Sequence, residues 1–85
     1  MRVDKYLKVA KILKKRTVAK GLADMDRVLV NGKVAKPSTI IKPTDTISVT
    51  FGKRTLTIRV LALMTQPKKE QIAQLYEIID ESYSE

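Results

Sequence analysis

Residues 1–25 read MRVDKYLKVAKILKKRTVAKGLADM, and two short helices are predicted within them. Apolar side chains recur at helical spacing, which predicts an amphipathic helix over residues 3–13. Its inner face comprises Val3, Tyr6, Leu7, Ala10 and Leu13. A second helix is expected at about 17–25, with Thr17 as N-cap and with Gly21 costing it about 1 kcal/mol. Its inner face is expected to comprise Val18, Ala19, Leu22 and Ala23.

Beyond residue 26 the apolar pattern changes to one typical of strands. Asn31-Gly32 lies between two apolar runs and supplies the two positive φ angles of a type I′ turn, so a hairpin is expected there. The predicted strands cover residues 27–30, 33–35, 46–51 and 54–63. Leu56, Ile58 and Val60 alternate along the last of them and should share a buried face.

The C-terminal segment is predicted to be a helix at about 67–82 that opens at Pro67. Its inward residues would be Ile72, Leu75, Tyr76 and Ile79. The order helix–helix–strands–helix predicts an α+β fold, with two N-terminal helices packed on a small antiparallel sheet. We expect residues 1–65 to form one domain and residues 66–85 to pack on it as a C-terminal helix.

Charge is distributed unevenly along the chain. Seventeen Lys and Arg against nine Asp and Glu give a net charge of +8, and residues 1–20 alone carry +7, whereas residues 66–85 carry −3. A basic end opposite an acidic end favours an oriented surface that binds a polyanion. The alternative is a solvated basic face that only keeps the protein soluble.

Composition narrows the class of function. The 85 residues include no Cys and no His, so no thiolate nucleophile, zinc site or histidine base is expected. We therefore predict a protein that is not an enzyme and needs no cofactor or metal. Apolar runs are far shorter than the roughly 20 residues that cross a bilayer, which favours a soluble protein. The absence of Cys fits the reducing cytoplasm, and we expect a monomer.

Basic residues on one helix face can follow the phosphates of an RNA backbone. Arg16, at the corner between the helices, is the strongest candidate because its guanidinium can fork onto phosphate or stack on a base. Asp4 either orients Arg16 toward the RNA or only offsets the helix dipole. Arg16 either binds RNA or serves as a salt-bridge partner of Asp4. The candidate RNA-binding residues are Arg2, Asp4, Lys5, Lys8, Lys11, Lys15, Arg16, Lys20, Lys33 and Lys36.

Anionic lipid and duplex DNA are the two alternatives to RNA as the ligand of the basic helices. The first helix could lie on anionic lipid, but its apolar face is small and the core needs it. Two helices with a basic corner could bind duplex DNA, but the second helix offers little besides Lys20 to contact bases. A sheet that stacks bases has no support among the four aromatic residues.

Five short stretches, taken in order, resemble the RNA-binding domain family named after small-subunit ribosomal protein S-four. They are RVDKYL at residues 2–7, KRTVA at 15–19, VLVNG at 28–32, KPS at 36–38 and KPTDTISV at 42–49. Among stand-alone members the chain is most similar to the RqcP family of ribosome-associated quality control, which is related to heat-shock protein fifteen. The residues carried over onto the RNA face are Arg2, Asp4, Lys5, Lys8, Lys15 and Arg16.

The resemblance implies a factor that binds large-subunit rRNA and P-site peptidyl-tRNA on large subunits split from stalled ribosomes. It also implies support of C-terminal alanine tailing by a partner of the RqcH (NEMF-like) family. A general ribosome-assembly or heat-shock RNA-binding protein that recycles large subunits is the alternative. The family usually has Gly where this chain has Thr44, and we expect a type I turn after Pro43 in which Thr44 needs no positive φ.

Overall fold

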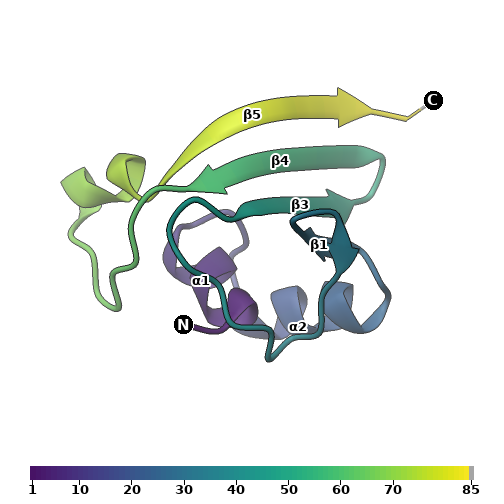
Figure 1. Cartoon of the computed structure of the whole chain (residues 1–85), viewed down its shortest axis with the longest axis horizontal. Coiled ribbons are helices and arrows are strands. Elements are labelled where there is room, and N and C mark those ends of the chain that lie inside the picture. The colour runs from purple at the N-terminus through teal and green to yellow at the C-terminus, as the bar shows by residue number, and fades with distance from the viewer. Residues whose placement is uncertain (85) are drawn as a thin grey trace.

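The computed structural model describes residues 1–84, in which two helices lie against one side of a curved antiparallel sheet (Figure 1). The elements are α1 Val3–Val9, α2 Arg16–Asp24, β1 Val28–Val30, β2 Lys33–Val34, β3 Thr46–Phe51, β4 Arg54–Val60, the 3₁₀ helix η1 Lys69–Gln74 and β5 Tyr76–Tyr83. The strands are ordered β2-β1-β3-β4-β5 and every neighbouring pair is antiparallel. The predicted α+β class, with its two N-terminal helices and antiparallel sheet, is confirmed.

The first helix is shorter than predicted and ends at Val9. Lys11 adopts a left-handed conformation with a φ of 62°. The N–H of Lys11 bonds to the carbonyl of Lys8 at 3.0 Å, and the N–H of Ile12 bonds to the carbonyl of Leu7 at 3.1 Å. This is the pattern of a Schellman cap, here with Lys where Gly is usual. The inner-face residues beyond Val9 remain buried because the chain folds back under the helix.

The N-cap of the second helix lies two residues before the predicted one. Lys15 is the N-cap and makes no side-chain capping bond, so the prediction of Thr17 in that role is wrong. Ala19, Leu22 and Ala23 are buried as expected, but Val18 is 45% exposed. A short helix against a small sheet buries only a narrow stripe, and Val18 lies about 90° round the helix from the centre of that stripe.

The predicted hairpin at Asn31-Gly32 is confirmed. The φ angles of the two residues are 52° and 81°, as a type I′ turn requires. The side chain of Asn31 also ties the hairpin to the next strand, since its Oδ1 accepts the N–H of Thr46 at 2.9 Å and its Nδ2 donates to Asp45 Oδ1 at 3.0 Å. Both polar atoms of the Asn31 amide therefore fix the hairpin turn to the start of β3.

The turn at residues 42–45 differs from the one expected. Thr44 has a φ of 80°, and the N–H of Asp45 bonds to the carbonyl of Lys42 at 3.1 Å, which together define a type II turn behind Pro43. The prediction of a type I turn is wrong. Asp45 Oδ2 accepts the N–H of Lys42 at 2.9 Å, and the N–H of Thr44 bonds to the carbonyl of Val60 at 2.8 Å. These bonds hold Thr in a conformation that costs an L-residue about 1–2 kcal/mol.

The predicted C-terminal helix is not formed. Residues 69–74 make a 3₁₀ helix instead, and Tyr76–Tyr83 add a fifth strand along the whole of β4, with a bulge opposite Thr57 and Ile58. Strand β4 ends at Val60, three residues earlier than expected. The segment is rich in Tyr and Ile, which favour a strand once an unpaired sheet edge is available.

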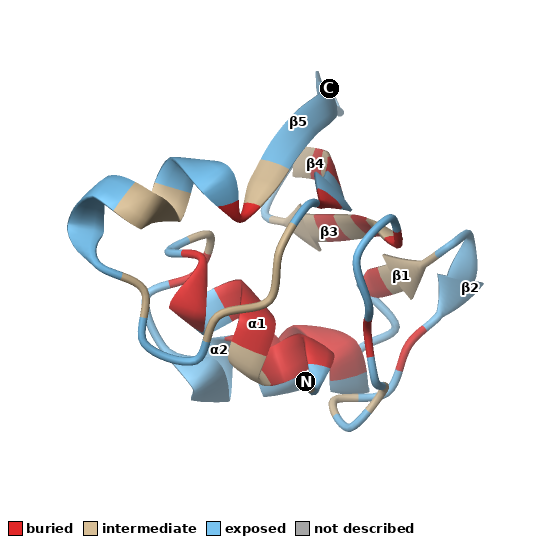
Figure 2. Ribbon diagram, turned by 60° about the vertical axis from the view of Figure 1, so that its left-hand side comes forward, coloured by how far each residue is buried: buried red, intermediate tan, exposed pale blue. Residues whose placement is uncertain are grey.

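Ion pairs across the last two strands reinforce this register. Arg54 Nη2 lies 2.6 Å from Glu81 Oε2, and Arg59 Nη1 lies 2.9 Å from Glu77 Oε1. Arg59 and Glu77 are directly opposite in the register, whereas Arg54 and Glu81 are a diagonal pair, and opposite charges in both arrangements stabilise strand pairing. Strand β5 itself is almost wholly exposed, as its pale colour in Figure 2 shows.

The core lies between the helices and the inner face of β3 and β4, where Figure 2 is red. The predicted inner face of β4 is confirmed, because Leu56, Ile58 and Val60 are all buried. One buried hydrogen bond connects the core to the C-terminal segment: the hydroxyl of Tyr6 donates to the carbonyl of Leu75 at 2.5 Å. Within residues 1–84 neither helix is long and apolar enough to span a bilayer.

Stability should fall in alkali because of Tyr6. Burial, with a smaller contribution from Tyr76, raises the pKa of Tyr6 from 10.0 to about 12. Because the folded-state pKa is the higher one, this contribution to stability is complete below about pH 10 and is lost as pH rises through 12. Thermal unfolding followed from pH 9 to 12 should show a smaller alkaline loss for Tyr6→Phe than for the wild type. Tyr83→Phe, at an exposed site, should keep most of the wild-type loss, and equal curves for both variants would contradict the prediction.

Candidate nucleic-acid interface

A buried carboxylate joins the beginnings of the two helices. Asp4, in the first turn of α1, is only 2% exposed. Its Oδ2 accepts a hydrogen bond from Arg2 Nη2 at 3.1 Å and lies 3.3 Å from Arg16 Nε, while its Oδ1 accepts the N–H of Lys5 at 2.7 Å. One side chain therefore fixes both arginines of the predicted RNA face.

The two arginines remain accessible despite this contact. The side chain of Arg2 is 43% exposed and that of Arg16 is 46% exposed. Arg16 uses Nε toward Asp4, and its two terminal nitrogens make no ion pair within residues 1–84. A guanidinium held along one edge can present its other edge to a phosphate without further loss of rotamer freedom. The two roles considered for Arg16, salt-bridge partner and RNA ligand, are thus compatible.

Three shallow hollows adjoin this pair. One lies over Asp4 between the helices and is lined by Arg2, Asp4, Arg16, Thr17 and Lys20. The next is lined by Lys5, Lys8, Val9, Arg16, Thr65 and Gln66. The third lies between α2 and residues 34–38 and includes Arg2, Lys20 and Lys36. Shared arginines and lysines make them continuous, and we call the surface of Arg2, Lys5, Lys8, Arg16, Lys20 and Lys36 the basic face.

Three predicted residues lie outside these hollows. Lys11 lines two neighbouring hollows, one with Pro67, Lys69 and Ile72 and one that it shares with Lys8, Thr65 and Gln66, so it lies at the edge of the basic face. Lys33 is on β2, beyond the hairpin turn. Lys15 is the exposed N-cap of α2 and lies beside Arg16 in the chain, but it lines none of the three hollows. The structure therefore groups six of the nine predicted cations and places Asp4 beneath them.

Polar residues that the sequence did not single out complete the surface. Thr65 and Gln66 belong to the loop after β4, which returns to α1 and lines the same hollow as Lys5 and Lys8. Thr17 lies beside Arg16 on α2. No local pattern marks Thr65 and Gln66, because they reach the site only through the packing of the loop against the helix, whereas Thr17 was predicted only as an N-cap.

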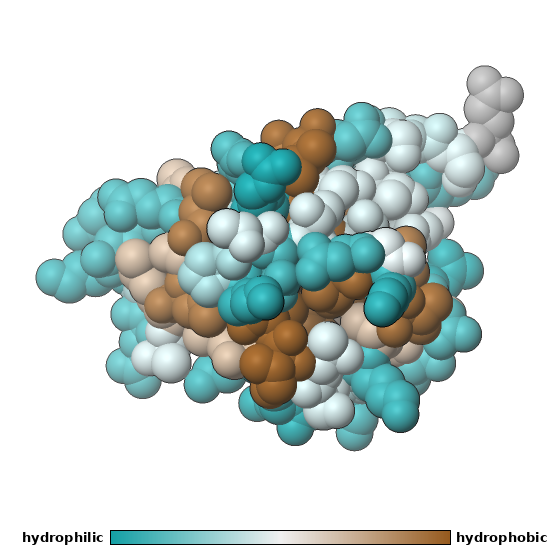
Figure 3. Space-filling model, in the orientation of Figure 1, coloured by the Kyte–Doolittle hydropathy of each residue, from teal (hydrophilic) through white to brown (hydrophobic). Residues whose placement is uncertain are grey.

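Aromatic side chains do not gather at this surface. Tyr6 is fully buried, and the ring of Phe51 lies under Arg54, with its centroid 5.2 Å from the guanidinium carbon. In the view of Figure 3 apolar side chains extend across the middle of one face of the molecule, and hydrophilic side chains lie around them. Within residues 1–84 no cluster of three or more His, Cys, Asp or Glu could hold a metal ion. The contacts available are those that bind phosphate and polar edges.

Comparison with known proteins agrees with this geometry. The sequence model of the S4 domain matches residues 1–47. The chain belongs to the S4 domain family. The predicted family is therefore confirmed, and the basic face lies on the helices at the start of the S4 domain.

Curated relatives of this S4 domain protein cover nearly all of the chain. The RQC P-site tRNA stabilizing factor of Streptococcus pneumoniae is 50% identical over 82 residues, which are 96% of this chain and 93% of that protein. The factor of the same name from Bacillus subtilis is 44% identical over 95% of this chain and 94% of its own length. The predicted similarity to the RqcP family is confirmed, and the chain is a non-enzymatic RNA-binding protein as expected.

A solved structure supports the fold. The trimeric heat shock protein 15 of Vibrio cholerae superposes with a TM-score of 0.83 at 29% identity, over 92% of this chain and 80% of that one. The relation to heat-shock protein fifteen is confirmed as well.

Proposed function

We propose that this S4 domain protein stabilises P-site tRNA in ribosome-associated quality control. The observation that carries the proposal is the buried Asp4 carboxylate holding Arg2 and Arg16 at fixed positions on an exposed basic face. Relatives named for this activity cover at least 95% of the chain, which supports the assignment. The binding target would be the large subunit that still carries peptidyl-tRNA after a stalled ribosome has split.

The shape of the basic face suits contact with more than one RNA strand. Arg16 separates a hollow containing Lys5 and Lys8 from one containing Lys20. Two phosphate backbones, one from large-subunit rRNA and one from the tRNA, would each find cations on one side of Arg16. The six cations would bridge the two RNAs and so retain the tRNA in its site.

The finer parts of the proposal concern partners. We infer that the protein acts as a monomer in the cytoplasm and supports C-terminal alanine tailing by a factor of the RqcH (NEMF-like) family. Retention of the tRNA would keep the peptide in place while that factor extends it.

A second candidate is a recycling role like that of the heat-shock relatives, supported by the TM-score of 0.83 to heat shock protein 15. Crosslinking with RNA sequencing separates the two. Clustered reads from tRNA as well as large-subunit rRNA support the first function, and rRNA reads without tRNA support the second.

Arg16→Lys should weaken association with large subunits carrying peptidyl-tRNA about tenfold, which corresponds to about 1.4 kcal/mol. Lysine keeps the net charge, but a single ammonium cannot contact Asp4 along one edge and a phosphate along the other. Lys11→Ala, which removes a charge at the edge of the basic face and away from Asp4, should cost less. Sedimentation of tagged variants with split large subunits measures both. If Arg16→Lys sediments like the wild type and Lys11→Ala is lost, total charge decides binding and the proposed site is wrong.

A further inference from the structure

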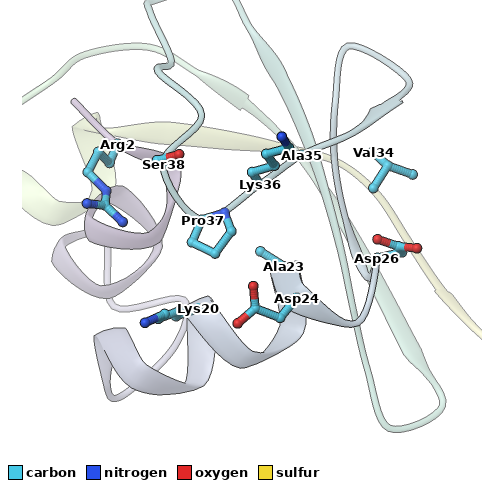
Figure 4. A pocket seen from close by; sticks show the side chains of 10 residues that line it. All are labelled: Arg2, Lys20, Ala23, Asp24, Asp26, Val34, Ala35, Lys36, Pro37 and Ser38. Carbon is cyan, nitrogen blue, oxygen red and sulfur yellow. The ribbon is translucent and has the colours of Figure 1, made fainter.

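The third hollow differs chemically from the rest of the basic face. It lies between the C-terminal half of α2 and the segment after β2, as Figure 4 shows. Its lining comprises Arg2, Lys20, Ala23, Asp24, Asp26, Val34, Ala35, Lys36, Pro37 and Ser38. It therefore combines cations, carboxylates and apolar side chains, where the other two hollows are mainly basic and polar.

The cations continue the RNA surface into this hollow. Arg2 and Lys20 line both this hollow and the one over Asp4. Lys36 contributes a third positive charge from the segment after β2. An RNA backbone bound over Asp4 would therefore pass the open side of the hollow, within reach of these cations.

A carboxylate is unexpected on a surface for phosphate. Asp24 is exposed at the last residue of α2, and its carboxyl points toward Pro37 across the hollow (Figure 4). Although Lys20 is one helical turn away, Asp24 forms no ion pair within 4.0 Å among residues 1–84. It would repel a phosphate, but an ionised carboxylate accepts hydrogen bonds from the amino groups of bases.

Apolar side chains supply a surface for a flat ring. Ala23 and Ala35 are buried at the floor, and Pro37 is half-buried. Val34 is 57% exposed at the edge of the hollow. A base removed from its stack needs an apolar contact for its faces and a polar partner for its edge, and both are present.

We propose that this hollow binds one unstacked RNA base bearing an exocyclic amino group, with Asp24 accepting from that amino group and Arg2, Lys20 and Lys36 near the flanking phosphates. The proposal rests on the RNA-binding function proposed above. It adds a base preference to a surface that otherwise contacts the backbone.

Pentacytidine and the pentamer of its 4-deamino analogue, pyrimidin-2-one riboside, provide the test, because the two bases differ only in the exocyclic amino donor, whereas uracil has a ring N3–H that can also donate to a carboxylate. Each oligonucleotide is titrated into the labelled full-length protein, and backbone amide shifts are followed by NMR. The wild type should bind pentacytidine about fivefold more tightly than the deamino pentamer, given one hydrogen bond to a charged acceptor in an open site. Amide shifts should include Ala23, Asp24 and Lys36.

Asp24→Asn should reduce the preference to less than about twofold, because a neutral amide oxygen accepts from the amino group more weakly than a carboxylate does. Asp80→Asn makes the same change of charge on exposed β5 and should keep the fivefold preference.

Three results would overturn the base site. The first is equal affinity of the wild type for the two oligonucleotides, and the second is an unchanged preference in Asp24→Asn. The third is that Asp24→Asn and Asp80→Asn raise the affinity for both oligonucleotides by the same factor. Asp24→Asn is also sedimented with large subunits. A variant that still sediments but has lost its preference supports both proposals. If the wild type itself fails to sediment with large subunits, the ribosomal function is rejected, and the preference between the two oligonucleotides is not affected by that result.

Discussion

Asp4→Asn should lower the affinity for large subunits carrying peptidyl-tRNA by about tenfold or more, although it makes the protein one charge more positive. The reason is that Oδ2 of Asp4 holds both Arg2 and Arg16. A neutral amide oxygen binds guanidinium more weakly, and the amide nitrogen repels it. Without this shared partner the two arginine side chains are mobile in the free protein, so RNA binding must order them at a cost in rotamer entropy.

Sedimentation with split large subunits measures this effect, and Asp80→Asn is the matched control because it adds the same charge on β5. Generic attraction to a polyanion would make both variants bind slightly better than the wild type. The free energy of unfolding of Asp4→Asn should fall by about 1–3 kcal/mol, so binding is compared at a temperature where urea titration finds the variant folded. Equal or tighter binding by folded Asp4→Asn would refute the positioning role of this carboxylate.

Leu75→Ala should lower the free energy of unfolding by about 2–5 kcal/mol, as expected for a large-to-small change in a thin core. Leu75 is fully buried where η1 ends and β5 begins. Its carbonyl accepts bonds from the N–H groups of Leu61 and Ala62, at 2.8 and 3.2 Å, as well as from the hydroxyl of Tyr6. The residue thus fastens the C-terminal segment to α1 and to the end of β4.

Urea unfolding monitored by circular dichroism tests this prediction, with Ile79→Ala as the control. Ile79 is 45% exposed on β5, so its truncation should cost less than about 1 kcal/mol. Comparable losses in the two variants would mean that β5, and not the buried joint at Leu75, anchors the segment.

The N-terminal half of the fold was predictable because its signals are local. Helical spacing of apolar residues before Met25 and the Asn31-Gly32 turn each reflect interactions between near neighbours. The C-terminal segment was not, since Ile72, Leu75 and Tyr76 fit a helical stripe as well as they fit a 3₁₀ turn followed by a strand. The unpaired edge of β4 decides between the two, and that edge exists only in the folded sheet.

At the site too, features encoded by residue type were predictable, and features set by tertiary contacts were not. The residue types of the basic face follow from the sequence, whereas the joint hold of Asp4 on Arg2 and Arg16 depends on how the two helices meet. Thr44 is the converse case. The folded loop imposes a left-handed conformation that Thr does not favour. The long-range bond from the N–H of Thr44 to the carbonyl of Val60, together with the bond from the N–H of Lys42 to Asp45 within the turn, overrides the local preference.

The placement of β5 gives the molecule an electric dipole. On β4 and β5 Arg59 and Arg54 offset Glu77 and Glu81 and leave Asp80 in excess, whereas the uncompensated cations of the basic face gather around the helices packed under the inner strands (Figure 1). In the field of a ribosomal surface such a charge distribution experiences a torque as well as an attraction. The torque turns the helices toward the RNA before contact, so a larger share of diffusional encounters begins in the binding orientation. Added salt, which screens the field over about 10 Å at 0.1 M, should therefore slow association as well as weaken the complex.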